Sequence, residues 1–238
     1  MEMDMKVIEQ LVAQALKEMK AEEPAAFVKP KEETYGVFAT MDEAIEASAK
    51  AQKTLLFSKI EDRQRYVDII RATILRRENL ELISRMAVEE TAIGKYEHKL
   101  IKNRLAAEKT PGTEDLVTEA QTGDHGLTLV EYCPFGVIGA ITPTTNPTET
   151  IICNSISMIA GGNTVVFSPH PRAKESTIAA AKVVLEAAVK AGAPEGIIGW
   201  IDVPSLELTN EVMKNADIIL ATGGPGMVKA AYSSGKPA

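Results

Sequence analysis

The chain has 238 residues, of which 45% are hydrophobic and 25% are charged, as in an ordinary globular protein with a substantial core. Its formal net charge of -7 argues against a general nucleic-acid binder or a binder of anionic membranes, because both need a basic face. No apolar run approaches the roughly 20 residues of a membrane span, and the N-terminus lacks a signal-peptide apolar region. Two cysteines, Cys133 and Cys153, predict no disulfide framework and favour a reduced, cytoplasmic protein.

The first 20 residues have the pattern of an amphipathic helix. Apolar residues recur there at spacings of three and four, and charged residues fall mostly between them. Residues 21–34 contain Pro24 and Pro30 among charges and are typical of a linker. A helix tethered in this way buries its apolar stripe against its own body, a second copy or a partner. A membrane-surface role is disfavoured, since the polar face is not predominantly basic.

A folded body is expected from residue 35, and it begins with helices. Thr40 and Glu43 form a capping box that starts the first of them. Three more helices are predicted over residues 60–77, 79–91 and 95–108. The charges of the last one are interpreted as a solvated face without chemistry.

A β-hairpin is predicted over residues 114–133. Its strands are residues 116–121 and 127–133, and a glycine-containing loop over 122–126 joins them. His125 lies at the tip, where it is interpreted as a turn residue rather than a ligand.

The next segment has the pattern of a strand–helix–strand unit. Residues 137–141 form a short apolar run rich in β-branched residues, which predicts a buried strand. Asn146 is then a favoured N-cap and Pro147 suits the first helical position. Cys153 falls inside this helix, where a small buried residue is expected. A second strand is predicted over 164–167.

Helices and strands alternate in the remainder of the chain. Helices are predicted over 176–191, 206–214 and 227–233, and strands over 196–201 and 218–221. This alternation predicts an α/β fold with a doubly wound, mainly parallel sheet. Such sheets bind ligands outside the carboxyl ends of their strands, where the strand order reverses.

The runs PFGVIGAITPTTNP and GGNTVVFSPHP resemble the aldehyde dehydrogenase superfamily, in particular the coenzyme-A-acylating aldehyde dehydrogenases of bacterial microcompartments. The resemblance runs from Gly36 to the end and implies that residues 35–238 are the Rossmann-like NAD-binding domain, with the hairpin as an oligomerisation arm. Members of this family are roughly twice as long. The resemblance therefore implies that the domain with the catalytic cysteine is absent here.

The resemblance also implies roles for the loop between the first strand and its helix. Asn146 matches the family's asparagine, whose amide stabilises the oxyanion of a thiohemiacetal intermediate, and Thr142, Pro143 and Thr144 precede it beside the cofactor. The alternative is that Asn146 is only an N-cap. The two roles are compatible, since a capping asparagine uses its carbonyl oxygen and leaves its NH₂ group free.

Two further loops match cofactor-binding segments of the family. Ser168, Pro169 and His170 stand where many members have Lys-Pro-Ser, and Pro171 replaces a following glutamate. The loss of that lysine and glutamate weakens ribose recognition and suits a site that also admits coenzyme A. Thr222, Gly223 and Gly224 match the loop that approaches the cofactor pyrophosphate, since glycines let backbone amides come close to phosphate.

These implications predict the cofactor-binding portion of an NAD-dependent enzyme that converts propionaldehyde or acetaldehyde to acyl-coenzyme A. Without the nucleophile, the chain by itself is predicted to be inactive. Residues 1–20 are expected to bind shell or cargo proteins of a microcompartment, and the full-length parent is expected to be a homo-oligomer. The alternatives are a cargo-binding module that works through its N-terminal helix, or the aldehyde domain of an aldehyde–alcohol dehydrogenase. No metal site is predicted.

Overall fold

The computed structural model describes residues 36–38 and 40–238. The predicted N-terminal helix and the whole predicted linker, residues 21–34, lie outside these residues. The helices are α2 (Met41–Leu56), α3 (Ile60–Ile74), α4 (Arg77–Thr91), α5 (Tyr96–Lys109), α6 (Pro147–Ala160), α7 (Lys174–Lys190), α8 (Leu206–Asn215) and α9 (Pro225–Tyr232), with short 3₁₀ turns η1 (Thr113–Asp115) and η2 (Pro171–Ala173). The strands are β1 (Val37–Phe38), β2 (Glu119–Gly123), β3 (Gly126–Val130), β4 (Val137–Ile141), β5 (Thr164–Ser168), β6 (Ile198–Ile201) and β7 (Ile218–Ala221).

Five strands form a parallel sheet in the order β1-β6-β5-β4-β7. This confirms the predicted α/β class with a parallel, doubly wound sheet. The chain adds β5 and then β6 on one side of β4, and it returns to place β7 on the other side. The strand order therefore reverses at β4. Strand β1 was not predicted, because two residues carry no periodicity and their pairing with β6 depends on the tertiary fold.

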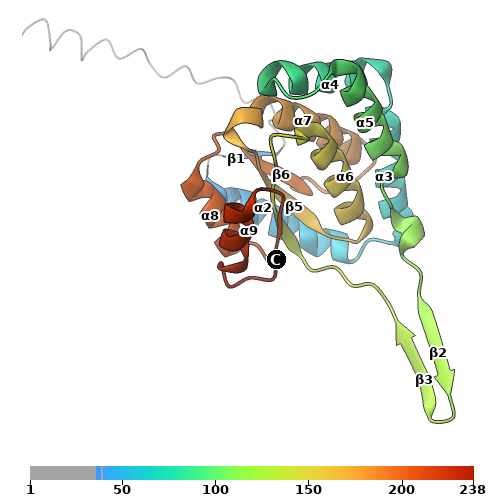
Figure 1. The fold of residues 1–238 in the computed structure, drawn as a ribbon. Coiled ribbons are helices and arrows are strands. Elements are labelled where there is room, and N and C mark those ends of the chain that lie inside the picture. Colours follow the sequence, from blue (N-terminus) through green and yellow to red (C-terminus); the bar gives the residue numbers. More distant parts are fainter. Residues whose placement is uncertain (1–35, 39) are drawn as a thin grey trace, which may run out of the picture. The chain divides into compact units, whose positions relative to one another are not determined.

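Helices cover both faces of the sheet, as Figure 1 shows. Side chains of β4 alternate between them: Ile138 belongs to the core with α6 and α7, and Val137 to the core with α2 and α8. Gly139 lets α8 approach closely, because a Cβ atom there would lie 2.6 Å from Cγ1 of Val212. All five residues of β4 are buried, which explains the continuous apolar run in the sequence.

The helical entry follows the sequence closely. The predicted capping box is present: the Glu43 amide donates to Thr40 Oγ1 at 3.2 Å, and the Thr40 amide donates to Glu43 Oε2 at 3.3 Å. Helix α3 ends three residues before the predicted boundary, and Arg77 already belongs to α4. Among the described residues, no helix is long and apolar enough to cross a membrane.

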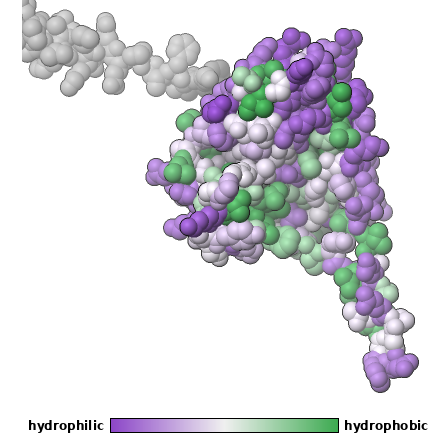
Figure 2. Space-filling model, in the orientation of Figure 1, coloured by the Kyte–Doolittle hydropathy of each residue, from purple (hydrophilic) through white to green (hydrophobic). Residues whose placement is uncertain are grey.

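The hairpin of β2 and β3 leaves the body as a separate antiparallel ribbon (Figure 1). Its turn is tighter than predicted: Gly123 pairs with Gly126, so only Asp124 and His125 form the loop. Strand β2 starts three residues later and ends two residues later than predicted, and β3 starts one residue earlier and ends three residues earlier. Every residue of both strands is exposed, including Leu127 and Leu129, and hydrophobic residues reach the surface along this part of the molecule in Figure 2.

Arg71 of α3 fixes the segment that leads into the hairpin. Its Nη2 donates to the Thr110 carbonyl at 2.6 Å and to Glu114 Oε1 at 2.8 Å. The hydrogen bond from Arg71 is the main reason that the pKa of Glu114 lies below its ordinary value. A carboxylate with a lowered pKa stabilises the fold above its unfolded pKa, and this contribution is lost as the pH falls through the folded pKa.

We therefore expect Glu114→Gln to lower the melting temperature by about 1–2 °C at pH 7, the size of a partly exposed ion pair. The difference from the unsubstituted chain should shrink as the pH falls below the ordinary range of a glutamate. Thermal melts over a pH series measure this. Glu119→Gln removes the same charge from the same arm and is the matched control. A difference that stays constant down to acidic pH would contradict the role of the ion pair.

Candidate functional site

Three loops predicted to form the site meet at the carboxyl ends of adjacent strands. The Thr142 amide donates to the Ser168 carbonyl at 3.1 Å, which links the ends of β4 and β5. The Thr222 amide donates to the Ile141 carbonyl at 3.0 Å, which links the ends of β4 and β7. Because the strand order reverses at β4, this is the crevice where doubly wound sheets bind ligands.

The loop after β5 offers little side-chain chemistry. Ser168 is buried, and its hydroxyl lies 2.9 Å from the Thr209 hydroxyl of α8. Pro169 is buried as well. His170 is exposed, and its Nδ1 accepts a hydrogen bond from the Arg172 amide at 3.1 Å, whereas its Nε2 has no partner among the described residues. The loop therefore offers a ligand mainly its backbone groups and the His170 side chain.

The glycine loop after β7 can accept an anion. Thr222, Gly223 and Gly224 are exposed and lead into α9, whose first turn has no capping side chain. Free amide groups and the helix dipole at such an end favour a phosphate. A Cβ atom built on Gly224 meets no atom within 4 Å, so the space above this turn is open. The residues present thus fit a dinucleotide pyrophosphate.

Asn146 stands at the N-cap position of α6, and Pro147 is its first helical residue, as predicted. Its side chain, however, makes no capping hydrogen bond. The expectation that its carbonyl oxygen caps the helix is therefore wrong. Asn146 Oδ1 instead accepts a hydrogen bond from Lys102 Nζ of α5. The long lysine side chain reaches the oxygen across the interface between α5 and α6, and this tertiary contact left no local sequence signal.

Helix α5 also contributes a buried lysine. Only 3% of the Lys99 side chain is exposed, and its Nζ donates to the Thr145 carbonyl at 2.7 Å and lies 3.2 Å from Glu149 Oε1. Glu149 lies 3.5 Å from Lys102 Nζ as well. The interpretation of the α5 charges as a solvated face is thus wrong for Lys99. Its spacing of four from the buried Asn103 was the available signal.

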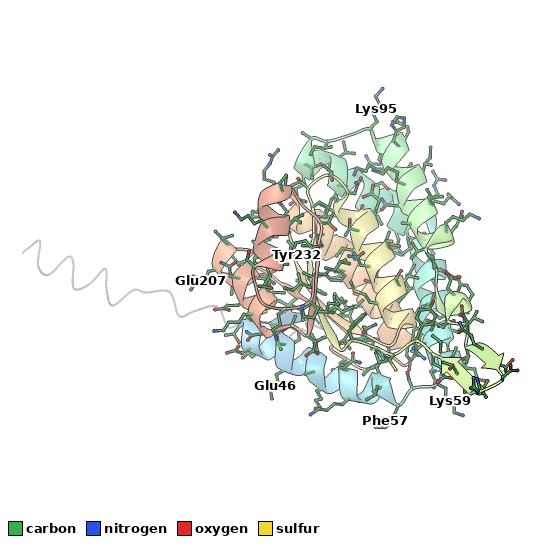
Figure 3. All side chains as sticks on the ribbon, turned by 60° about the horizontal axis from the view of Figure 1, so that its bottom comes forward. Glu46, Phe57, Lys59, Lys95, Glu207 and Tyr232 are labelled. Carbon is green, nitrogen blue, oxygen red and sulfur yellow. The ribbon has the colours of Figure 1, made fainter. Side chains whose placement is uncertain are left out.

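An open groove of about 530 Å³ runs beside this cluster, between residues of α5 and α6. In Figure 3, Lys95 marks the residue before α5 and Tyr232 the last residue of α9, and α6 lies between these helices. Asn146, Cys153 and Thr222 line the groove. The NH₂ group of Asn146 has no partner among the described residues, and Asn146 is half-buried. A neutral donor of this kind can stabilise a developing oxyanion.

Cys153 is exposed in this groove, so the expectation that it is buried is wrong. The apolar face of α6 passes through Ile152 and Ile156, and position 153 lies off that face. Cys153 is nevertheless a poor nucleophile for a site at Asn146. Cys153 lies seven positions after Asn146, about 10 Å along the helix axis, whereas an oxyanion donor must lie about 3 Å from the charge.

The solved structures that resemble the chain include propionaldehyde dehydrogenases. A propionaldehyde dehydrogenase from Rhodopseudomonas palustris, solved with bound coenzyme A and an acylated cysteine, is 58% identical, with a TM-score of 0.82 over 85% of this chain and 46% of that one. A propionaldehyde dehydrogenase from the fucose utilisation microcompartment of Clostridium phytofermentans is 49% identical, with a TM-score of 0.81 over 85% of this chain and 47% of that one.

Curated relatives include a CoA-propanoylating propanal dehydrogenase from Salmonella typhimurium, 41% identical over 84% of this chain and 43% of its own length. An acetylating acetaldehyde dehydrogenase from the same organism is 38% identical over 96% of this chain and 48% of its length. The chain thus spans about half the length of these relatives. Residues 12–235 match the aldehyde dehydrogenase family. The chain belongs to the aldehyde dehydrogenase family.

Proposed function

We propose that the chain is the cofactor-binding portion of an NAD-dependent, coenzyme-A-acylating aldehyde dehydrogenase that converts propionaldehyde or acetaldehyde to the acyl-coenzyme A. The observation that carries the proposal is the meeting of Thr142, Ser168 and Thr222 at one end of the sheet, beside the unpartnered NH₂ group of Asn146. The similarity to acylating enzymes supports the same chemistry.

A bound nicotinamide cofactor would supply the acceptor for the hydride that leaves the aldehyde carbon. Thr142, Pro143 and Thr144 would hold it at the end of β4, and Ser168, Pro169 and His170 would hold it at the end of β5. The amides of Gly223 and Gly224 would face the pyrophosphate at the start of α9. Nothing in these loops offers an acidic side chain for the ribose. Recognition by backbone would also suit coenzyme A, whose adenosine and pyrophosphate resemble those of NAD.

Asn146 would act on the aldehyde oxygen. A cysteine thiolate in the part of the relatives that this chain does not match would attack the aldehyde, and the oxygen would gain negative charge. The NH₂ group of Asn146 would donate to that oxygen. The resulting thioester would pass its acyl group to the coenzyme A thiol.

The aldehyde part of an aldehyde–alcohol dehydrogenase is the second candidate. The relative of that kind from Clostridium acetobutylicum is 52% identical, but the match covers 66% of this chain. The acylating enzymes without an alcohol dehydrogenase part match 84% and 96% of it. The difference in coverage favours the stand-alone acylating type.

Residues 1–20 and the hairpin are proposed to bind other proteins. The amphipathic stripe of residues 1–20, followed by a polar linker, suits a peptide that binds shell or cargo proteins inside a bacterial microcompartment, the setting of the Clostridium phytofermentans relative. The hairpin exposes the apolar residues Leu127, Leu129 and Val130 on β3 and suits an arm that pairs subunits of the full-length protein.

The cofactor site is tested by calorimetric titration of the chain with NAD, with coenzyme A as competitor. We expect saturable NAD binding that coenzyme A displaces. Gly224→Val should weaken NAD binding about tenfold or more without lowering the melting temperature, because its side chain enters open space above the first turn of α9 and its φ of -72° suits any residue. Gly123→Val in the hairpin, where a Cβ atom also meets no atom within 4 Å, serves as a control outside the loop. An unchanged affinity of Gly224→Val for NAD would mean that the cofactor pyrophosphate does not bind at the first turn of α9.

The acylating activity is tested in a hybrid, in which residues 36–238 replace the matching segment of the Rhodopseudomonas palustris enzyme. The hybrid should form NADH from propionaldehyde and coenzyme A, whereas the 238-residue chain alone should form none. Asn146→Ala should lower kcat of the hybrid by about 10²–10³-fold, the cost of one oxyanion donor. Cys153→Ser should leave kcat near that of the hybrid. NADH formation by the chain alone would contradict the prediction that it lacks the catalytic nucleophile.

The targeting role is tested by fusing residues 1–20 to a fluorescent protein in a host that makes microcompartments. We expect the fusion to co-purify with shells. Exchanging Leu11 and Leu16 for glutamate should abolish this, since it breaks the apolar stripe. Exchanging Glu2 and Glu9 on the polar side for glutamine is the matched control. Equal recovery of all fusions, or of none, would count against targeting.

A further inference from the structure

We propose that Lys102 is a positioning residue that sets the orientation of the Asn146 amide and increases its strength as a hydrogen-bond donor. The inference rests on the proposed oxyanion role of Asn146 and adds a residue outside the predicted site. Lys102 lies on α5, whereas Asn146 begins α6, so the contact joins two elements that are 44 residues apart in the chain.

The chemistry of the two groups fixes which way the amide faces. A lysine ammonium has three donors and no acceptor, so only the carbonyl oxygen of an asparagine can face it. Lys102 Nζ donates to Asn146 Oδ1. The NH₂ group must therefore point away from Lys102, and Asn146 lines the groove. An amide without such a neighbour can turn its oxygen toward the groove, where it would repel an oxyanion.

The lysine is itself held in place. Glu149, whose side chain is 10% exposed, lies 3.5 Å from Lys102 Nζ and 3.2 Å from Lys99 Nζ. Lys99 also donates to the Thr145 carbonyl, next to Asn146 in the chain. The Thr145 carbonyl and the Asn146 side chain thus each contact a lysine, and the two lysines share the Glu149 carboxylate. Two lysines and one glutamate leave a net positive charge, which favours an anion nearby.

The contact has a second effect on the amide. A cation at Oδ1 draws electron density from the nitrogen, and linked hydrogen bonds strengthen one another in this way. The NH₂ group becomes a stronger donor where charge develops on the substrate. This benefit arises mainly in the transition state, so its loss should lower kcat more than it changes KM.

The test compares Lys102→Met, which removes the charge and the donors, with Lys102→Arg, which keeps both. Lys109→Met is the matched control: Lys109 lies on the same helix and lines the same groove, and the described residues give it no ion pair or hydrogen bond. The first readout is the side-chain amide signal of Asn146 in a ¹⁵N-correlated NMR spectrum of the 238-residue chain, assigned by its loss in Asn146→Ala.

We expect Lys102→Met to move this signal toward that of a free asparagine, and Lys102→Arg and Lys109→Met to leave it near its original position. In the hybrid enzyme, Lys102→Met should lower kcat about tenfold, with KM for propionaldehyde changed less than about twofold, and Lys102→Arg should restore most of the loss. An unmoved signal in Lys102→Met, or equal kinetic losses in Lys102→Met and Lys109→Met, would overturn the inference.

The two readouts separate this inference from the proposed function. If Asn146→Ala leaves kcat of the hybrid unchanged, the catalytic role of Asn146 fails, whatever the NMR signal shows. If Asn146→Ala is strongly impaired and Lys102→Met is not, the role of Asn146 stands and that of Lys102 is overturned.

Discussion

The structure depends on one constraint: β4 is paired on both sides and covered on both faces. Its two neighbours, β5 and β7, run parallel to it, so all three strands deliver their following loops to the same edge. Thr142, Ser168 and Thr222 come from loops that are far apart in the chain, and they meet only because β4 is the point where the strand order reverses. A shift of β4 by one residue would exchange its faces and disperse the site.

The buried pair of Lys99 and Glu149 holds the backbone next to Asn146 in place, and this pair has an energetic cost. Removing two charges from water is unfavourable, and their attraction offsets that cost only with good geometry. Loss of one partner from such a pair typically costs about 3–5 kcal/mol, because the remaining charge stays buried alone. The same ammonium binds the Thr145 carbonyl at 2.7 Å. A buried charge that also fixes the backbone beside the Asn146 amide therefore has a use that an apolar residue of equal volume lacks.

Much of the fold could be predicted because its signals are local. The capping box of Thr40, the apolar run of β4 and the start of α6 at Pro147 each follow from neighbouring residues. The loops at the strand ends were found through their resemblance to family motifs. The contact between Asn146 and Lys102 could not be predicted from neighbouring residues, because Lys102 lies on another helix, 44 residues away in the chain. The prediction that Cys153 is buried is wrong because only one face of α6 at that position is buried. The burial of Lys99 was not expected from the sequence because lysines are rarely buried.

The exposed hairpin has a consequence for how the protein behaves in solution. A lone two-stranded ribbon is only marginally stable in water, and every strand residue of β2 and β3 is exposed. A surface that covered the ribbon would stabilise it, by an amount that follows mass action. The body and the arm therefore differ in what stabilises them. The body packs its cores within one chain, whereas the arm would gain stability with the concentration of any surface that covered it.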